Sequence, residues 1–225
     1  MRELRVVATL SLLVLDIVLA MTQFAGPAQA HDPQDYYAAV RWPKNTTEVY
    51  YINQGVPTQA RASINAGLAV WSNLESGNGP AWNYAGVQNL PVETTCAKLG
   101  NSKIYWYRYS AADAKVAART LRCLDVYAKM QNFGMYFNPT IPGGTWNFGS
   151  GTPTSTQEDL RAVATHEAGH ATGWGDHFLD GYEANVCPAP PSSVTHTMCQ
   201  TVWMGKTWQR TLASHDLHTF DRAYP

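Results

Sequence analysis

Hydrophobic and polar positions along residues 31–225 change their period several times, and these changes predict a mixture of strands and helices. Runs of alternating, β-branched or aromatic residues predict strands in three places: 48–53, 102–109 and, as one or two strands, 125–138. The alanine-rich run 111–121 is ambiguous and permits a short helix. The polar segment 31–45 is expected to be a loose arm, and 139–153 is a connection rich in glycine and proline.

Apolar residues at helical spacing, with start and stop signals, predict three helices: 57–74, 155–172 and 214–224. The second begins with Ser-Thr-Gln-Glu, which has the form of a capping box. In that arrangement Ser155 caps the helix and Glu158 reaches back to the start. Gly173 is a natural left-handed terminator for the same helix. The elements together predict a single α+β domain.

The first thirty residues have the features of a secretory signal peptide. Arg2 and Arg5 form a positive start, 6–20 is largely apolar although Asp16 interrupts it, and Ala-Gln-Ala at 28–30 is a small-residue cleavage site. The apolar run is too short for a transmembrane span, so we expect no stable membrane insertion. We therefore predict that residues 1–30 are removed and that 31–225 is an exported, single-domain protein.

Export changes the meaning of the four cysteines, because disulfides form and persist in oxidising compartments. Four cysteines allow three pairings. We favour Cys96–Cys123 and Cys187–Cys199, since each closes a modest loop, while the connectivity stays open. No C-x-x-C spacing supports a zinc site made of cysteines.

Composition narrows the class of partner. Sixteen basic and seventeen acidic residues leave a net charge of -1, and no basic run suggests nucleic acid. We expect a monomer. The aromatic content is 12%, with eight tryptophans, and it has two explanations. The rings either fill the core or line an extended binding cleft.

The chemistry is concentrated in VATHEAGHATGWGDHF, residues 163–178. On a helix, His166 and His170 lie nearly above one another, so both imidazoles can reach one metal ion. Glu167 points about 100° away around the helix, which suits a general base that holds a water molecule. After the stop at Gly173, spacing favours Asp176 as the third zinc ligand, with His177 as the alternative.

HEAGHATGWGD, residues 166–176, resembles the motif of the metzincin zinc endopeptidases, in the snapalysin-type form that ends in aspartate. The resemblance implies that Asp176 is a zinc ligand and that Met198 lies beneath the metal in a tight turn. It also implies a small, twisted mixed sheet, a long helix, an active-site helix, and a C-terminal subdomain with the methionine turn and a closing helix similar to that of matrixins. Substrate would lie extended beside an edge strand, expected within 125–138.

The sequence therefore predicts a secreted endopeptidase with one catalytic zinc ion and protein or peptide substrates. His166, His170 and Asp176 would bind the metal, and Glu167 would activate water. A calcium ion is a further candidate cofactor, with Asp180 and Glu183 as its candidate ligands. The alternative is an exported, aromatic-rich protein that binds a polymer or glycan and carries a non-catalytic zinc site.

Overall fold

The computed structural model describes residues 40–72, 74, 78–141, 143–174, 197–199, 202–213, 216–217, 220 and 224. Its main sheet has five strands in the order β2-β1-β3-β5-β4. Their bounds are β1 Thr47–Asn53, β2 Ala81–Gln88, β3 Ser102–Trp106, β4 Ala118–Leu124 and β5 Met130–Phe137. β1, β2, β3 and β5 are parallel, and β4 runs antiparallel to β5 at the edge. The predicted mixed sheet and α+β architecture are confirmed.

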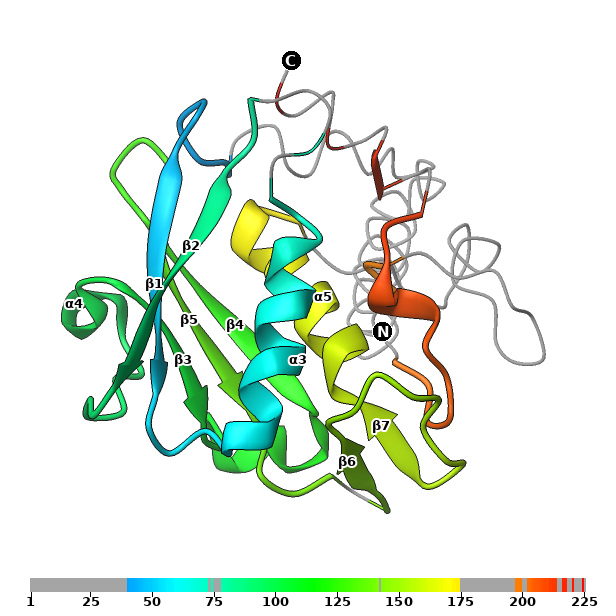
Figure 1. The fold of residues 1–225 in the computed structure, drawn as a ribbon. Coiled ribbons are helices and arrows are strands. Elements are labelled where there is room, and N and C mark those ends of the chain that lie inside the picture. Colours follow the sequence, from blue (N-terminus) through cyan, green and yellow to red (C-terminus); the bar gives the residue numbers. More distant parts are fainter. Residues whose placement is uncertain are drawn as a thin grey trace, which may run out of the picture. The chain divides into compact units, whose positions relative to one another are not determined.

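Two long helices, α3 (Thr58–Ala69) and α5 (Leu160–Thr172), lie side by side on one face of the sheet (Figure 1). α3 begins after Pro57 as predicted but ends before Leu74. After Ala69, the backbone hydrogen bonds join residues three apart instead of four, as in a 3-10 turn. Trp71, in this turn, packs in the main hydrophobic core with residues of α5. The indole Nε1 of Trp71 donates to the carbonyl of Thr165 at 2.7 Å. This bond fixes α5 against α3 inside the main hydrophobic core.

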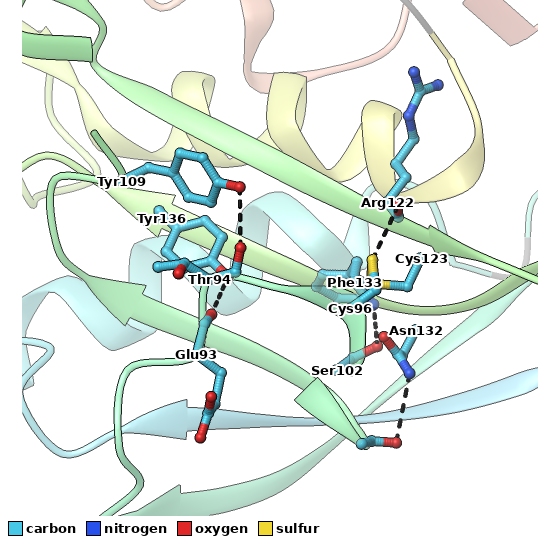
Figure 2. The surroundings of a disulfide bond; sticks show 11 residues. Glu93, Thr94, Cys96, Ser102, Tyr109, Arg122, Cys123, Asn132, Phe133 and Tyr136 are labelled. Atoms are coloured by element: carbon cyan, nitrogen blue, oxygen red, sulfur yellow. Dashed lines mark hydrogen bonds between the residues drawn. A yellow bond between two sulfur atoms is a disulfide. The ribbon is translucent and has the colours of Figure 1, made fainter. Parts of the chain in front are cut away.

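The other face of the sheet carries a smaller buried cluster: Leu99, Tyr105, Cys123 and Tyr136. The short helix α4 (Cys96–Leu99) covers this face, and the predicted Cys96–Cys123 disulfide ties it to β4 (Figure 2). The hydroxyl of Tyr109 donates to the carbonyl of Thr94 at 3.1 Å, which holds the preceding loop in place. Cys199 is also disulfide-bonded, and its predicted partner Cys187 lies outside the described residues.

The strands depart from the sequence-based expectations mainly in their order, because the pattern of a single strand does not determine its neighbours. Residues 111–121 contain a 3-10 turn, η1 (Ala111–Lys115), and the start of strand β4, rather than a helix. Within 125–138, only β5 is a strand, and it is an interior one. The edge strand is β4, so the expectation of a substrate-binding edge within 125–138 was incorrect. Strand β2 and the small parallel pair of β6 (Thr145–Asn147) and β7 (Gln157–Asp159) were not predicted.

The start of α5 also differs from the prediction. The N-cap is Asp159, whose Oδ1 accepts the backbone N–H of Ala162 at 2.9 Å. The predicted capping box of Ser155 and Glu158 does not form, because Glu158 is paired into β7. Asp159 is fully buried, and its Oδ2 accepts Nε of Arg210 at 2.8 Å. An ion pair from a distant segment therefore defines where α5 begins.

The other end of α5 is closed as predicted, at Gly173, which has a left-handed φ of 112°. Trp42 Nε1 donates to the carbonyl of Ala171 at 2.7 Å, and the hydroxyl of Tyr224 donates to that of Thr172 at 2.8 Å. The described part of 31–45 is therefore anchored here, in contrast to the expected loose arm. Of the described residues in the predicted C-terminal helix, Asp216, Leu217 and Phe220 are helical, and Tyr224 is not.

Across the part of the chain that the structure describes, we find no helix with the length and apolar character needed to span a membrane. The predicted signal peptide, residues 1–30, lies outside that part. The domain boundary at residue 31 stays a prediction.

Arg210→Ala should destabilise the fold by roughly 3–5 kcal/mol, because it leaves the buried Asp159 carboxylate without its counter-charge. The measurement is the free energy of unfolding in urea. Arg119→Ala is the matched control. Arg119 also pairs with an aspartate, Asp113, at 3.0 Å, but its side chain is 53% exposed. Arg119→Ala should therefore lower the free energy of unfolding by less than about 1 kcal/mol. Equal decreases in the two variants would contradict the prediction.

Candidate metal centre

His166, Glu167 and His170 form a compact cluster on α5. Their potential ligand atoms all lie within 4.8 Å of one another. The two imidazole rings stand edge to face at an interplanar angle of 87°. His166 and Glu167 are buried, and His170 is half-buried. The predicted pair of histidines four residues apart is therefore brought together by the helix, with the glutamate beside them.

Both imidazoles are oriented by backbone carbonyls. Nδ1 of His166 donates to the carbonyl of Thr197 at 3.0 Å, and Nδ1 of His170 donates to that of Trp174 at 2.7 Å. A carbonyl oxygen can only accept, so each Nδ1 carries a proton and the lone pair of the neutral ring is on Nε2. Metal-binding histidines usually have this arrangement. The donor set therefore fits a transition-metal ion of the zinc type.

The carbonyl that orients His166 is itself held by the C-terminal part of the chain. Gln209 Nε2 donates to the carbonyls of Thr197 and Cys199 at 3.1 and 2.9 Å. The Asp216 carboxylate accepts the backbone N–H of Thr197 at 3.0 Å. Gln209 and Asp216 are buried. The sequence reasoning missed both roles, since nothing in their local pattern shows which distant backbone atom they bind.

Met198, the predicted support beneath the metal, lies directly against α5. The Met198 side chain is 2% exposed, and its sulfur lies against Gly169 of α5. Gly169 stands between His166 and His170 in the sequence. A side chain at Gly169 would collide with that sulfur and come within 2.9 Å of the Trp71 ring. The position agrees with a packing role for Met198. Its role in supporting a bound metal stays a proposal.

Glu167 is held from the edge strand. The hydroxyl of Thr120, on β4, donates to Oε2 of Glu167 at 2.6 Å. Cys123, on the same strand, packs on the opposite face of the sheet and forms the disulfide with Cys96. β4 is therefore anchored on one face while Thr120 contacts the cluster from the other. Thr120 was not predicted, because only the strand order reveals that it faces α5.

The cluster lines a cleft of about 650 Å³ between β4 and α5. β4 and the residues before it contribute the cationic side chains Lys115, Arg119 and Arg122. The other lining includes Ile141, Val163, Val202 and Met204, which are apolar, and Glu158. Glu158 is 8% exposed, and burial raises its pKa from 4.5 to about 7. The lining of the cleft thus carries side chains of both charges, and Asp113, beside Arg119, is acidic as well.

Several predicted ligands lie outside the described residues: Asp176, His177, Asp180 and Glu183. The third zinc ligand, Asp176 or His177, and the candidate calcium site therefore stay predictions.

No family model and no curated protein matches the chain. In fold, the chain is similar to the solved structure of myroilysin, with a TM-score of 0.45 and 14% sequence identity. The match covers 88% of this chain and 87% of that chain. A TM-score below 0.5 carries no argument about function. The case for a metal centre therefore rests on the geometry of its own residues.

Glu158→Gln should stabilise the metal-free protein at pH 8 but change little at pH 5. The glutamate ionises near 4.5 in the unfolded chain and near 7 in the folded one. Stability is therefore lost as pH rises between these values, and the full penalty, at most about 3 kcal/mol, is present above pH 7. Glutamine carries no such penalty.

The measurement is urea unfolding of both proteins in EDTA at pH 5 and pH 8. EDTA removes any contribution from a bound metal to the pH dependence. A difference between the two proteins that is the same at both pH values would contradict the prediction.

Proposed function

We propose that the protein is a secreted zinc-dependent endopeptidase with a metzincin-like site. His166, His170 and Asp176 would bind one zinc ion, and Glu167 would be the general base. The observation that carries the proposal is a pair of imidazoles, each fixed through Nδ1 to a carbonyl, beside a buried carboxylate that lines the same cleft. A structural zinc site would not require that carboxylate.

Zinc held there would supply a Lewis acid that polarises a peptide carbonyl and makes a water molecule more acidic. Glu167 would accept a proton from the attacking water and deliver it to the amine nitrogen as the carbon–nitrogen bond breaks. Thr120 donates to Oε2. This leaves Oε1 to carry the proton, so the threonine is a positioning residue.

The substrate would lie extended along β4, which is an outer strand and lines the cleft. An extended peptide can add to such an edge through main-chain hydrogen bonds. This replaces the earlier expectation of an edge within 125–138. Protein or peptide substrates and a monomeric state stay part of the proposal.

Export is supported by the signal-like residues 1–30 and by the Cys96–Cys123 disulfide. The alternative of an aromatic-rich polymer-binding protein is less well supported. All eight tryptophans lie in the described part of the chain, and each is buried or half-buried. Six of the eight tryptophans belong to the main hydrophobic core or pack against it: Trp42, Trp71, Trp82, Trp106, Trp146 and Trp174.

Residues 31–225 should bind about one zinc ion and cleave casein, whereas Glu167→Ala should bind zinc equally and lose nearly all cleavage. The reason is that Glu167 would transfer a proton in the reaction and is not expected to be a metal ligand. Zinc content by mass spectrometry and casein cleavage provide the two measurements. His166→Ala is the matched control, and it should lose both zinc and activity.

Zinc binding by the parent without cleavage would favour the polymer-binding alternative, and a pull-down on insoluble polysaccharide would test it. Absence of zinc from the parent would overturn the proposal. In the same assay, loss of zinc in Asp176→Ala but not in His177→Ala would identify the third ligand as Asp176, and the reverse would identify His177.

Thr120→Val should lower kcat about tenfold or more with little change in KM and zinc content, because it removes a hydrogen bond to an ionised group. Thr120→Ser keeps the hydroxyl and should restore most of the rate. Steady-state kinetics on a casein-derived peptide would measure both. Equal rates for the valine and serine variants would show that the hydroxyl does not position Glu167.

A further inference from the structure

Glu158 is the one residue in the lining of the cleft whose buried charge is left without a partner. Its side chain has no hydrogen bond or ion pair with any residue that the structure describes, although it is only 8% exposed. The next residue, Asp159, is equally buried but is paired with Arg210 and caps α5. Neighbouring side chains on a strand point in opposite directions. Glu158 therefore faces the cleft while Asp159 faces the fold.

The position of Glu158 relative to the metal centre follows from α5. Val163, His166, Glu167 and His170 all line the cleft, at the spacing of one helical face. Glu158 stands just before the helix begins, beyond Val163. At about 1.5 Å per residue, the start of α5 lies roughly 9 Å along the helix axis from His166. Glu158 precedes that start by two residues, so only a long substrate side chain would bring a cation from the metal centre to its carboxylate.

The lining of the cleft also has an apolar part, made by Ile141, Val163, Val202 and Met204. A lysine or arginine side chain has an aliphatic stem that packs on apolar surface and a charged end that needs a carboxylate. The described cations of the cleft, Lys115, Arg119 and Arg122, belong to β4 and the residues before it, and none of them forms an ion pair with Glu158. Arg119 pairs with Asp113, and Arg122 donates to the carbonyl of Trp174. They do not neutralise Glu158.

We propose that Glu158 is a specificity-determining residue, which makes this end of the cleft a subsite for a lysine or arginine side chain flanking the bond to be cleaved. The proposal rests on the proposed peptidase function. The buried carboxylate would gain its counter-charge from the substrate, and a neutral side chain would leave it unpaired. The substrate class would be proteins and peptides with basic residues next to the cleaved bond.

The test compares two peptide series that differ at one position, lysine in one and norleucine in the other, placed in turn at each residue around the cleaved bond. The parent should cleave the lysine peptide at least about tenfold faster in kcat/KM when lysine occupies the position that meets Glu158. Glu158→Gln should reduce that ratio by about tenfold. Glu48→Gln is the matched control and should leave the ratio unchanged, because the Glu48 carboxylate accepts the Ser102 hydroxyl and does not line the cleft.

A second arm measures binding of the same peptides to the zinc-loaded Glu167→Ala variant by calorimetry, so that it does not depend on cleavage. If the parent cleaves peptides with no preference for lysine at any position, this proposal is overturned while the peptidase function stands. If no peptide is cleaved, the proposed peptidase function is wrong. The calorimetric binding measurement then tests the cation subsite by itself. Tighter binding of the lysine peptide that is lost in the Glu158→Gln, Glu167→Ala double variant supports a cation subsite, and equal binding overturns it.

Discussion

The burial of α5 is the constraint on which the rest of the structure depends. Eleven of its thirteen residues are buried, and these include His166 and Glu167. A buried polar group that lacks a hydrogen-bond partner costs about 1–3 kcal/mol, and a helix side chain that cannot bond within its own helix needs a partner from outside it. Thr120, Thr197 and Trp174 provide these partners. The same hydrogen bonds therefore also orient the two imidazoles and the carboxylate of the candidate metal centre.

Two of these partners, Thr120 and Thr197, are far from α5 in the sequence, which couples the candidate metal centre to the completed fold. Thr120 belongs to the edge strand β4, and the Cys96–Cys123 disulfide holds that strand to α4 on the far face of the sheet. Thr197 depends on Gln209 and Asp216 for its position. The two imidazoles and the carboxylate can therefore keep their mutual geometry only after the sheet and the C-terminal segment have packed on α5.

The same distinction between local and distant contacts explains how much could be predicted. The histidine spacing and the end of α5 at Gly173 depend on residues within one or two helical turns, and these predictions were correct in position. The start of α5 was wrong because Arg210, 51 residues from Asp159, selects the cap. The interior place of β5 and the edge place of β4 depend on strand pairing, which the pattern of a single strand does not contain. Thr120 could not be predicted for the same reason.

Glu158 differs from the polar groups of the cluster, because its buried side chain has no hydrogen-bond or ionic partner among the described residues. The adjacent Asp159, on the same strand, both caps α5 and forms an ion pair with Arg210, whereas Glu158 has neither kind of contact among the described residues. Glutamine would fit the same space without the cost of a buried charge. Departures from such local rules are expected where function needs them. A carboxylate that has no partner among the described residues, and that lines the same cleft as the candidate metal centre, would gain its counter-charge from a cation on the substrate.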